Sequence, residues 1–268
     1  ADPPDPPPAT TTVPSPETTG PPPAASAPAP VPATHPPAAE PLRILVVGDS
    51  TARALAAGLV EWAYASGAAQ VTVAAQGGCG LIRGGDYPDP FFNVALQMTC
   101  AEMVARVIPD ALPAADVVLI LTTVADTWER SWDQGETWLD LSDQAYRDRL
   151  VADYAAFVDE ARDAGVPTVL WLRPPVAAYG DGGDEHAAPV IDESFTNGEQ
   201  DFIESVVVEL ASRHPGLVRY EDLRAWFEAV GMADDPAVRP DGTHFTAEAA
   251  RRIVDEWLAP LLAGLPRR

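Results

Sequence analysis

The segment RPDGTHFT, residues 239–246, places an aspartate and a histidine three positions apart, Asp241 and His244, with Gly242 between them. A tight turn can bring such a carboxylate against the imidazole, where it fixes the tautomer and stabilises the imidazolium formed during proton transfer. Thr246 is also a good N-cap for a following helix. On its own, the segment is therefore better explained as an acidic turn before a capped helix.

A serine that could act as a nucleophile lies near the start of the chain, in the motif Gly48-Asp49-Ser50. The motif follows a β-branched apolar run and precedes a stretch rich in Ala and Leu, so we expect Ser50 on a strand-to-helix turn. A helix N-terminus and nearby backbone N–H groups could stabilise an oxyanion there. Serine is equally a good N-cap at such a position, and this motif alone decides nothing.

Two of the other histidines have simpler explanations than His244. His214 precedes Pro215 at an expected helix end, where it can interact with the helix dipole. His186 lies in the polar loop GDGGDEHAAP, which we expect at the surface. His244 is therefore the best candidate for a base that would activate Ser50, with Asp241 as its orienting carboxylate.

Apolar runs alternate with amphipathic stretches along the chain, which predicts strands and helices in turn. The expected strands cover residues 43–50, 70–78, 116–126, 166–175 and 217–223. The expected helices cover residues 51–66, 144–165, 199–216 and 246–265. This order predicts an α/β fold, a three-layer α/β/α sandwich around a five-stranded parallel sheet. Ligands of such folds bind at the carboxyl ends of the strands, where Ser50, the glycines near Gly78, Asp126 and the turn with Asp241 and His244 all fall.

The composition limits the possible partners. The net charge is −23, and all 17 basic residues are Arg. A surface this acidic lacks the basic patch that nucleic acids and anionic membranes require. We therefore expect neither nucleic acid nor an anionic lipid surface as a partner.

The first 41 residues differ from the rest, because they are mostly Pro, Ala and Thr and contain no aromatic residue. Such a segment cannot bury enough apolar surface to fold, and dense proline keeps it extended. We expect residues 1–41 to form a disordered linker or stalk and residues 42–268 to form the folded domain. The chain has no apolar run long enough for a transmembrane helix and no visible signal peptide. We expect it to be the mature or excised form of a longer protein.

Two cysteines, Cys79 and Cys100, are too few for a metal cluster of the CxxC type. If the protein is exported, they are expected to form a disulfide; in the cytosol they would be two buried thiols. The extracellular character of the first forty residues favours the disulfide. No clustered His/Asp spacing and no Gly-x-Gly-x-x-Gly motif after the first strand is present, so we expect no metal and no cofactor.

The combination of Ser after the first strand and Asp-x-x-His before the last helix resembles the SGNH, or GDSL-like, hydrolase family. The resemblance spans about residues 43–262 and implies a flavodoxin-like SGNH fold with Ser50, His244 and Asp241 as a catalytic triad. It also implies an oxyanion hole built from the backbone N–H of Ser50 and of a glycine in the second block, QGGCG, either Gly78 or Gly80.

The third block of the family departs from its usual Gly-x-Asn-Asp, because this chain has Thr123-Val124-Ala125-Asp126. Ala125 stands where the asparagine of the oxyanion hole would be, and losing one such donor typically costs about 10²–10³ in rate. Another group could replace the donor, the enzyme could be slow, or the site could be inactive. Thr123 and Trp128 could shape the pocket.

Candidate substrate contacts are Asp49, Thr123, Asp126 and Trp128. For Trp128, Trp132 and Trp138, packing under a long loop is favoured over a platform for a sugar ring.

The Gly-Cys-Gly of the second block, its partner cysteine and a third block without Asn resemble more narrowly the SGNH domains attached to membrane acyltransferase-3 proteins. This implies an extracytoplasmic O-acyltransferase or esterase that moves an acyl group, often acetyl, to or from a cell-envelope glycan or glycolipid. It also implies tethering through the linker to a membrane acyltransferase domain that precedes residue 1. A free-standing secreted carbohydrate esterase or lipase and a non-catalytic envelope-binding domain remain as alternatives.

Overall fold

The computed structural model describes residues 40–87, 94–177, 193–233 and 235–268. The described part from Glu40 onward packs as one unit. Nearly all of the predicted linker, residues 1–41, lies outside the described residues, and so does the predicted surface loop with His186. The linker therefore remains a prediction.

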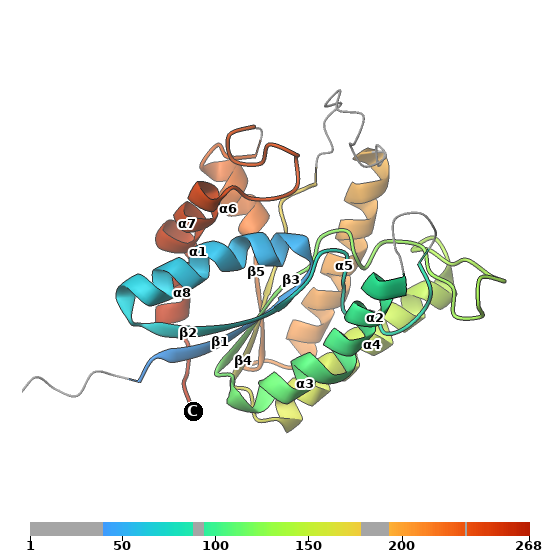
Figure 1. The fold of residues 1–268 in the computed structure, drawn as a ribbon, viewed down its shortest axis with the longest axis horizontal. Helices are drawn as coiled ribbons and strands as arrows, with labels where there is room; N and C mark the ends of the chain where they lie inside the picture. Colours follow the sequence, from blue (N-terminus) through green and yellow to red (C-terminus); the bar gives the residue numbers. More distant parts are fainter. Residues whose placement is uncertain (1–39, 88–93, 178–192, 234) are drawn as a thin grey trace, which may run out of the picture. The chain divides into compact units, whose positions relative to one another are not determined.

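Five parallel strands form a single sheet in the order β2-β1-β3-β4-β5 (Figure 1). They are β1 (Leu42–Gly48), β2 (Ala69–Ala75), β3 (Val117–Leu121), β4 (Thr168–Leu172) and β5 (Val218–Glu221). The strand order reverses between β1 and β3, and ligands of doubly wound sheets bind beyond the strand ends at such a reversal. The predicted α/β fold with a five-stranded parallel sheet is confirmed.

The central strands are apolar on both faces because helices cover both faces of the sheet. In β1, Leu42, Ile44 and Val46 belong to one core cluster, whereas Leu45 and Val47 belong to the other. The side chains of β3 and β4 alternate in the same way. This explains why the strands appear in the sequence as continuous apolar runs.

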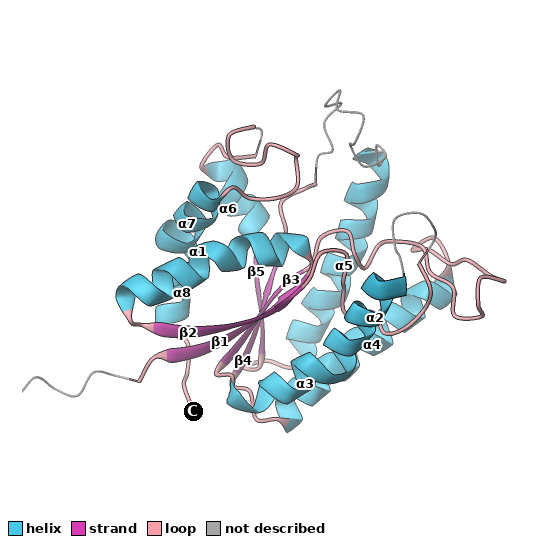
Figure 2. Cartoon of the chain, in the orientation of Figure 1, coloured by secondary structure: helices cyan, strands magenta, loops and turns pink. Residues whose placement is uncertain are grey.

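The helices form two layers, one on each side of the sheet (Figure 2). One layer contains α1 (Ser50–Ser66), α6 (Leu223–Ala229), α7 (Ala247–Ile253), the π-helical turn η3 (Val254–Leu258) and α8 (Ala259–Ala263). The other contains α2 (Val94–Glu102), the π-helical turn η1 (Met103–Val107), α3 (Ile108–Ala111), the 3₁₀ turn η2 (Leu112–Ala114), α4 (Gln144–Asp163) and α5 (Glu193–Arg213).

Several elements differ from the sequence prediction. The helix expected over residues 246–265 is a succession of α7, η3 and α8, because Pro260 has no N–H for a regular helical hydrogen bond. The helical segments between residues 94 and 114, and α6, were not predicted. The expected strand over residues 116–126 already ends at Leu121, so the third block lies in the loop beyond the strand.

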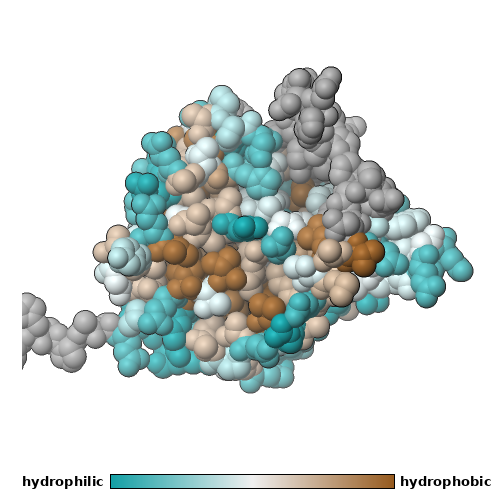
Figure 3. All heavy atoms as spheres, in the orientation of Figure 1, coloured by the Kyte–Doolittle hydropathy of each residue, from teal (hydrophilic) through white to brown (hydrophobic). Residues whose placement is uncertain are grey.

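Among the described helices, none combines the length and the apolar composition that a membrane-spanning segment requires. Hydrophobic surface is present over α1 and the edge strand β2 (Figure 3), where the side chains of Val60 and Val73 are exposed.

Candidate active site

The turn before α7 brings Asp241 and His244 together as the sequence predicts. Nδ1 of His244 lies 2.5 Å from Oδ2 of Asp241. The other carboxylate oxygen, Oδ1, accepts hydrogen bonds from the backbone N–H groups of Thr243 and His244, at 2.9 and 2.7 Å. Partial burial raises the pKa of Asp241, but the hydrogen bonds from His244 and Thr243 outweigh it, and the net pKa is lowered. The ionised carboxylate therefore accepts from Nδ1–H, which leaves Nε2 of His244 as a basic nitrogen.

Arg239 fixes this turn against the rest of the domain. Its guanidinium donates to the carbonyl of Val176, in the segment after β4, at 2.5 Å and to that of Ala233 at 2.8 Å. The guanidinium carbon also lies 5.2 Å from the centre of the Phe227 ring, within cation–π range. Arg239 is buried. Nothing in the sequence around it, where it precedes Pro240, predicted that it would anchor the turn.

Ser50 is the first residue of α1, and Asp49 is the N-cap of this helix. Serine was considered as the cap itself; the structure gives that role to Asp49, whose Oδ1 accepts from the backbone N–H of Thr51 at 2.9 Å. Among the described residues, none forms a hydrogen bond with the Ser50 hydroxyl. The hydroxyl is half-buried, and the N–H of Ser50 belongs to the first helical turn, which has no intrahelical acceptor.

A buried network holds this end of α1 to the loop after β3. Oδ2 of Asp49 accepts from the backbone N–H and from the hydroxyl of Thr123, both at 2.7 Å. The Thr51 and Thr123 hydroxyl oxygens lie 3.2 Å apart. Burial raises the pKa of the Asp49 carboxyl, although these hydrogen bonds act in the opposite direction.

Asp49 and Thr123, both expected to contact substrate, belong to this network, and their substrate contact stays a prediction. Asp49 is 1% exposed, and Thr123, which was expected at the pocket, is 2% exposed with its hydroxyl bound to Asp49. Both carboxylate oxygens of Asp49 are engaged by Thr51 and Thr123. Asp49 and Thr123 therefore position the start of α1, on both sides of Ser50.

The glycine-rich loop after β2 lies beside Ser50. A Cβ placed on Gly77 would lie 3.7 Å from Cβ of Ser50, in ordinary contact. Gly77 was not singled out by the sequence argument, although it is the first glycine of QGGCG. Gly78 follows in a left-handed conformation, with φ of +77°, and is half-buried. The loop is thus close enough to Ser50 to contribute to an oxyanion hole.

Gly80 has a different environment from Gly78. A Cβ placed on Gly80 would lie only 1.8 Å from Oδ1 of Asp126. Only glycine allows the loop to approach this carboxylate so closely. Of the two candidate oxyanion donors, Gly80 is therefore packed against Asp126, whereas Gly78 follows Gly77, on which an added Cβ would lie 3.7 Å from Cβ of Ser50.

Asp126 is fully buried, and its expected contact with substrate stays a prediction. Its carboxylate accepts from the backbone N–H of Leu81 at 2.9 Å, from that of Ile82 at 3.0 Å and from the hydroxyl of Tyr154 at 2.9 Å. The Arg130 guanidinium, also buried, lies 3.7 Å away. With all of these partners and no exposed surface, Asp126 positions the loop after Gly80.

The predicted disulfide between Cys79 and Cys100 is present, with the two Cα atoms 5.1 Å apart. It connects the loop after β2 to helix α2. Together with Asp126, it holds the loop on both sides of Gly80.

Ala125 is fully buried, and its carbonyl accepts from the Arg130 guanidinium at 3.1 Å. The position that would carry the asparagine of the third block is thus packed inside the protein. Within the part of the chain that the structure describes, no side-chain amide forms a hydrogen bond with Ser50 in place of the missing asparagine.

Two of the three tryptophans after the third block, Trp128 and Trp132, pack against neighbouring aromatic residues, whereas Trp138 is exposed. Trp128 meets the Tyr87 ring edge-on at 6.3 Å, and Trp132 meets the Tyr146 ring at 5.8 Å. Nε1 of Trp132 donates to the carbonyl of Arg83 at 3.2 Å. These contacts support the packing interpretation for Trp132; Trp128 is half-buried, and its expected substrate contact stays a prediction.

The helices that carry the two halves of the site are in close contact. A Cβ placed on Gly58 of α1 would lie 2.5 Å from the carbonyl carbon of Ala250 in α7. Ser50 begins α1, and His244 stands just before α7, so the close packing of the two helices limits how far the two residues can move relative to each other.

No group of three or more His, Cys, Asp or Glu residues in the described ranges could hold a metal ion.

Comparisons with known proteins place the chain in a family. It matches the family model described as "SGNH domain (fused to AT3 domains)" over residues 18–259. Among solved structures it is similar to a lipopolysaccharide acetyltransferase periplasmic domain from Salmonella ser. Paratyphi A, with 13% identity and a TM-score of 0.53, covering 83% of this chain and 84% of that chain.

It is also similar to a family two carbohydrate esterase from Clostridium thermocellum, solved as an active-site mutant, with 13% identity and a TM-score of 0.50, covering 84% of this chain and 65% of that chain. At such identities the structural likeness concerns the fold alone. A search among functionally curated proteins finds no match. The family model, however, covers most of the sequence and includes both halves of the site. The chain therefore belongs to the family of SGNH domains that are fused to AT3 domains.

Proposed function

We propose that this protein is an extracytoplasmic serine O-acyltransferase or esterase, which moves an acyl group, most simply acetyl, to or from a cell-envelope glycan or glycolipid. The observation that carries the proposal is the 2.5 Å contact between Asp241 and His244 in a domain whose α1 begins with Ser50. Membership of a family fused to AT3 domains supports acyl transfer. The name of the similar structure, a lipopolysaccharide acetyltransferase periplasmic domain, suggests an envelope glycan as acceptor.

In the first step, Nε2 of His244 takes the proton of the Ser50 hydroxyl, and the serine oxygen attacks the carbonyl carbon of the acyl donor. Asp241 holds the ring through Nδ1 and stabilises the imidazolium. The N–H groups of Ser50 and Gly78 stabilise the oxyanion. Collapse of the intermediate breaks the bond to the leaving group, which receives the proton from His244 and leaves acyl-Ser50.

In the second step, a hydroxyl attacks the acyl-Ser50 ester while Nε2 of His244 accepts its proton. The bond between the acyl carbon and Oγ of Ser50 then breaks, and His244 returns the proton to the serine oxygen. A sugar hydroxyl gives transfer, and water gives hydrolysis. The two outcomes share the same residues and differ only in whether an acceptor is positioned and water is kept out. Transfer is our primary proposal because the family is fused to membrane acyltransferase domains, which could supply the acyl group.

We also propose that the domain works outside the cytoplasm, next to a membrane acyltransferase domain of the same longer protein. The disulfide between Cys79 and Cys100 supports an oxidising compartment. The Pro-rich segment at residues 1–41 would serve as the tether.

Trapping of the acyl-enzyme tests this function. The wild-type protein should gain one phosphonyl group on Ser50 from a fluorophosphonate and one acetyl group from an activated acetyl ester, as measured by intact mass and peptide mapping. Ser50→Ala should lose both modifications and ester turnover. Ser205→Ala, which removes an exposed hydroxyl on α5, is the matched control and should behave as the wild type.

Equal turnover by the Ser50→Ala protein and the wild type would refute the proposal. An unlabelled Ser50 together with measurable glycan binding would instead support a non-catalytic envelope-binding domain. Product analysis with and without a glycan acceptor then separates transfer from hydrolysis.

A further inference from the structure

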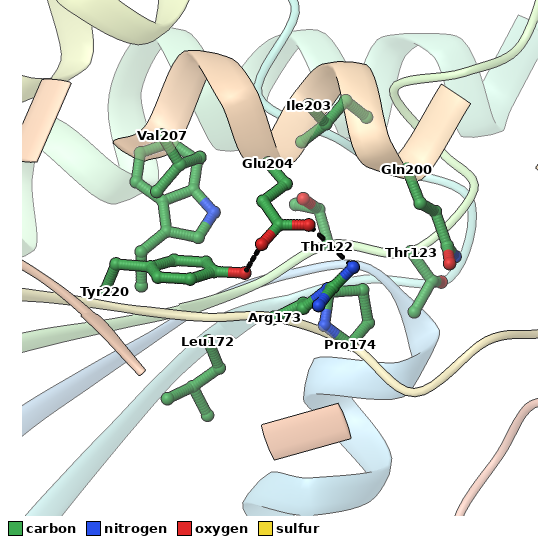
Figure 4. Close-up of a pocket in the computed structure, with 11 residues that line it drawn as sticks. Thr122, Thr123, Leu172, Arg173, Pro174, Gln200, Ile203, Glu204, Val207 and Tyr220 are labelled. Atoms are coloured by element: carbon green, nitrogen blue, oxygen red, sulfur yellow. Dashed lines mark hydrogen bonds and ion pairs between the residues drawn. The ribbon is translucent and has the colours of Figure 1, made fainter. Parts of the chain in front are cut away.

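A narrow cavity opens beyond the carboxyl ends of β3, β4 and β5, beside the network that holds Ser50 (Figure 4). Its walls include Thr122 and Thr123 after β3, Arg173 after β4, and Gln200 and Glu204 of α5. The cavity volume is about 20 Å³. A buried site of about 10–15 Å³ already holds one water molecule, so the cavity admits a group the size of a single hydroxyl.

Gln200 is the unexplained residue of this cavity. Its side chain is more than nine-tenths buried, yet neither Oε1 nor Nε2 has a hydrogen-bond partner in the described residues. Buried polar atoms in folded proteins are rarely left unpaired, and each exception requires an explanation. In Figure 4 the Gln200 side chain extends from α5 toward the loop that carries Thr123. A carboxamide both donates and accepts, so its natural partner is a group that does the same.

The Thr122 hydroxyl adds a second polar group to the wall. It is 3% exposed and forms no hydrogen bond of normal geometry, although it interacts with the nearby Tyr154 hydroxyl. The wall therefore offers a ligand a second polar side chain besides that of Gln200.

The charges around the cavity disfavour an anion. Arg173 is the cation in the wall, and its guanidinium already pairs with Glu204 at 2.7 Å, Asp222 at 3.2 Å and Asp201 at 3.4 Å. Glu204 also accepts from the Tyr220 hydroxyl at 2.8 Å. With three carboxylates on one guanidinium, a further anionic group would be repelled. The cavity thus suits a neutral group.

Thr123 connects the cavity to the candidate nucleophile. The residue lines the cavity, and its hydroxyl donates to Asp49 and contacts that of Thr51. Asp49 and Thr51 are the two neighbours of Ser50 in the chain. A ligand held in the cavity is therefore separated from the Ser50 site by one layer of side chains.

We propose that this cavity is an acceptor subsite, in which Gln200 binds one hydroxyl of a neutral sugar. This inference rests on the proposed function for its purpose, acceptor selection, but the binding itself needs no turnover. Gln200 would favour neutral sugars over uronic acids.

Binding is measured on the full chain with Ser50→Ala, so that no reaction interferes. The probes are methyl glycosides of glucose, galactose, mannose and N-acetylglucosamine, their monodeoxy analogues and glucuronic acid, added to ¹⁵N-labelled protein and followed by NMR. At least one neutral glycoside should shift the Gln200 side-chain amide signals. One of its monodeoxy analogues should bind about tenfold more weakly, as expected for a lost hydrogen bond.

Gln200→Leu in the same background should also weaken binding of the neutral glycoside by about tenfold. Gln144→Leu is the matched control, because Gln144 is an exposed glutamine at the start of α4, and it should leave the affinity unchanged. Gln200→Glu keeps the size of the side chain and should also weaken binding, which covers the case in which Gln200→Leu does not fold.

Three results would overturn the proposal: no response of Gln200 to any neutral glycoside, as for a cavity that holds only water; equal affinity of the Gln200 and Gln144 variants; or preferential binding of glucuronic acid. If the wild-type protein is not acylated at Ser50 but the glycosides still bind, the proposed catalysis is refuted and the subsite stands. The two hypotheses can therefore fail separately.

Discussion

Gly80 lies directly against the buried carboxylate of Asp126, so close that a Cβ on Gly80 would stand 1.8 Å from Oδ1. The same carboxylate accepts from the N–H groups of Leu81 and Ile82, the two residues that follow Gly80. One residue of the third block therefore holds the second block in place. The loop beside Ser50 is therefore held by Asp126, a residue that is completely buried.

We expect Gly80→Ala to destabilise the protein by roughly 3 kcal/mol, because the new methyl group must displace the Asp126 carboxylate and break its hydrogen bonds. Urea denaturation measures the free energy of unfolding. Gly198→Ala is the control: Gly198 lies in α5, and a Cβ there meets nothing within 4 Å. Equal stability of the two variants would show that the loop can move away from Asp126 at no cost.

Gly58→Ala should lower catalytic efficiency through the packing of α1 on α7. A Cβ at Gly58 would lie 2.5 Å from backbone atoms of Ala250, so the helices must separate, and Ser50 must move relative to His244. A misplacement of about 1 Å can cost about 10²-fold in rate. Turnover of an activated acetyl ester is compared for Gly58→Ala and Gly198→Ala at a temperature at which both are folded. A rate equal to that of the wild type would contradict the assigned contact between the two halves.

Ala125→Asn should not create a better oxyanion hole, although it restores the residue of the family motif. Ala125 is fully buried and its carbonyl is bound by Arg130, so the larger polar side chain must displace packed neighbours. We expect a loss of about 1–3 kcal/mol in the free energy of unfolding and no gain in kcat. A stable variant with a kcat raised by an order of magnitude would mean that the side chain reaches the site.

Asp241→Asn should reduce kcat by about 10³–10⁴, because a neutral amide neither selects the Nδ1–H tautomer of His244 nor stabilises the imidazolium. The lowered pKa of Asp241 means that the carboxylate is ionised at every pH at which an imidazole titrates. The loss should therefore be similar from pH 6 to pH 9, as measured by kcat for an acetyl ester. Asp235→Asn, a change in the preceding loop, serves as control, and a loss confined to low pH would argue against this role.

Because of Glu199, we expect the free energy of unfolding to fall as the pH rises. Burial raises the pKa of its carboxyl from 4.5 to about 8, although the Thr127 hydroxyl acts in the opposite direction. Between these two values the unfolded carboxyl loses its proton while the folded one keeps it, so the free energy of unfolding falls as the pH rises and levels off above about 8. Urea denaturation between pH 5 and pH 9 measures the slope.

Glu199→Gln removes this titration and should flatten the slope across that window. Glu209→Gln, an exposed change on the same helix, should retain the slope of the wild type. Parallel curves for the wild type and Glu199→Gln would show that Glu199 is ionised in the folded protein.

The strands and helices around the site could be predicted because their apolar residues follow a regular pattern. The strands at residues 42–48 and 117–121 are continuous apolar runs, and α1 and α4 have a clear helical periodicity. The segment from residue 94 to 114 could not be predicted in this way. Pro109 and Pro113 interrupt it, and exposed apolar residues such as Met98 obscure the period.

In the candidate site, the pair Asp241 and His244 was predictable because a short turn fixes their contact locally. The role of Asp126 was not, because the sequence places it beside a family motif but does not reveal that it is completely buried. Gln200 lies on an amphipathic helix where its burial depends on the neighbouring strands, and nothing in its local sequence marks it. The family membership and the disulfide were predicted and are confirmed; the catalytic roles stay predictions.

The close packing of α1 on α7 also orders events during synthesis of the protein. Ser50 leaves the ribosome before His244 and before the helix that docks on α1. Under the proposed mechanism, a nascent chain that stops short of the turn at Asp241 has Ser50 without its base. Acyl labelling of Ser50 would then report that α7 has docked on α1.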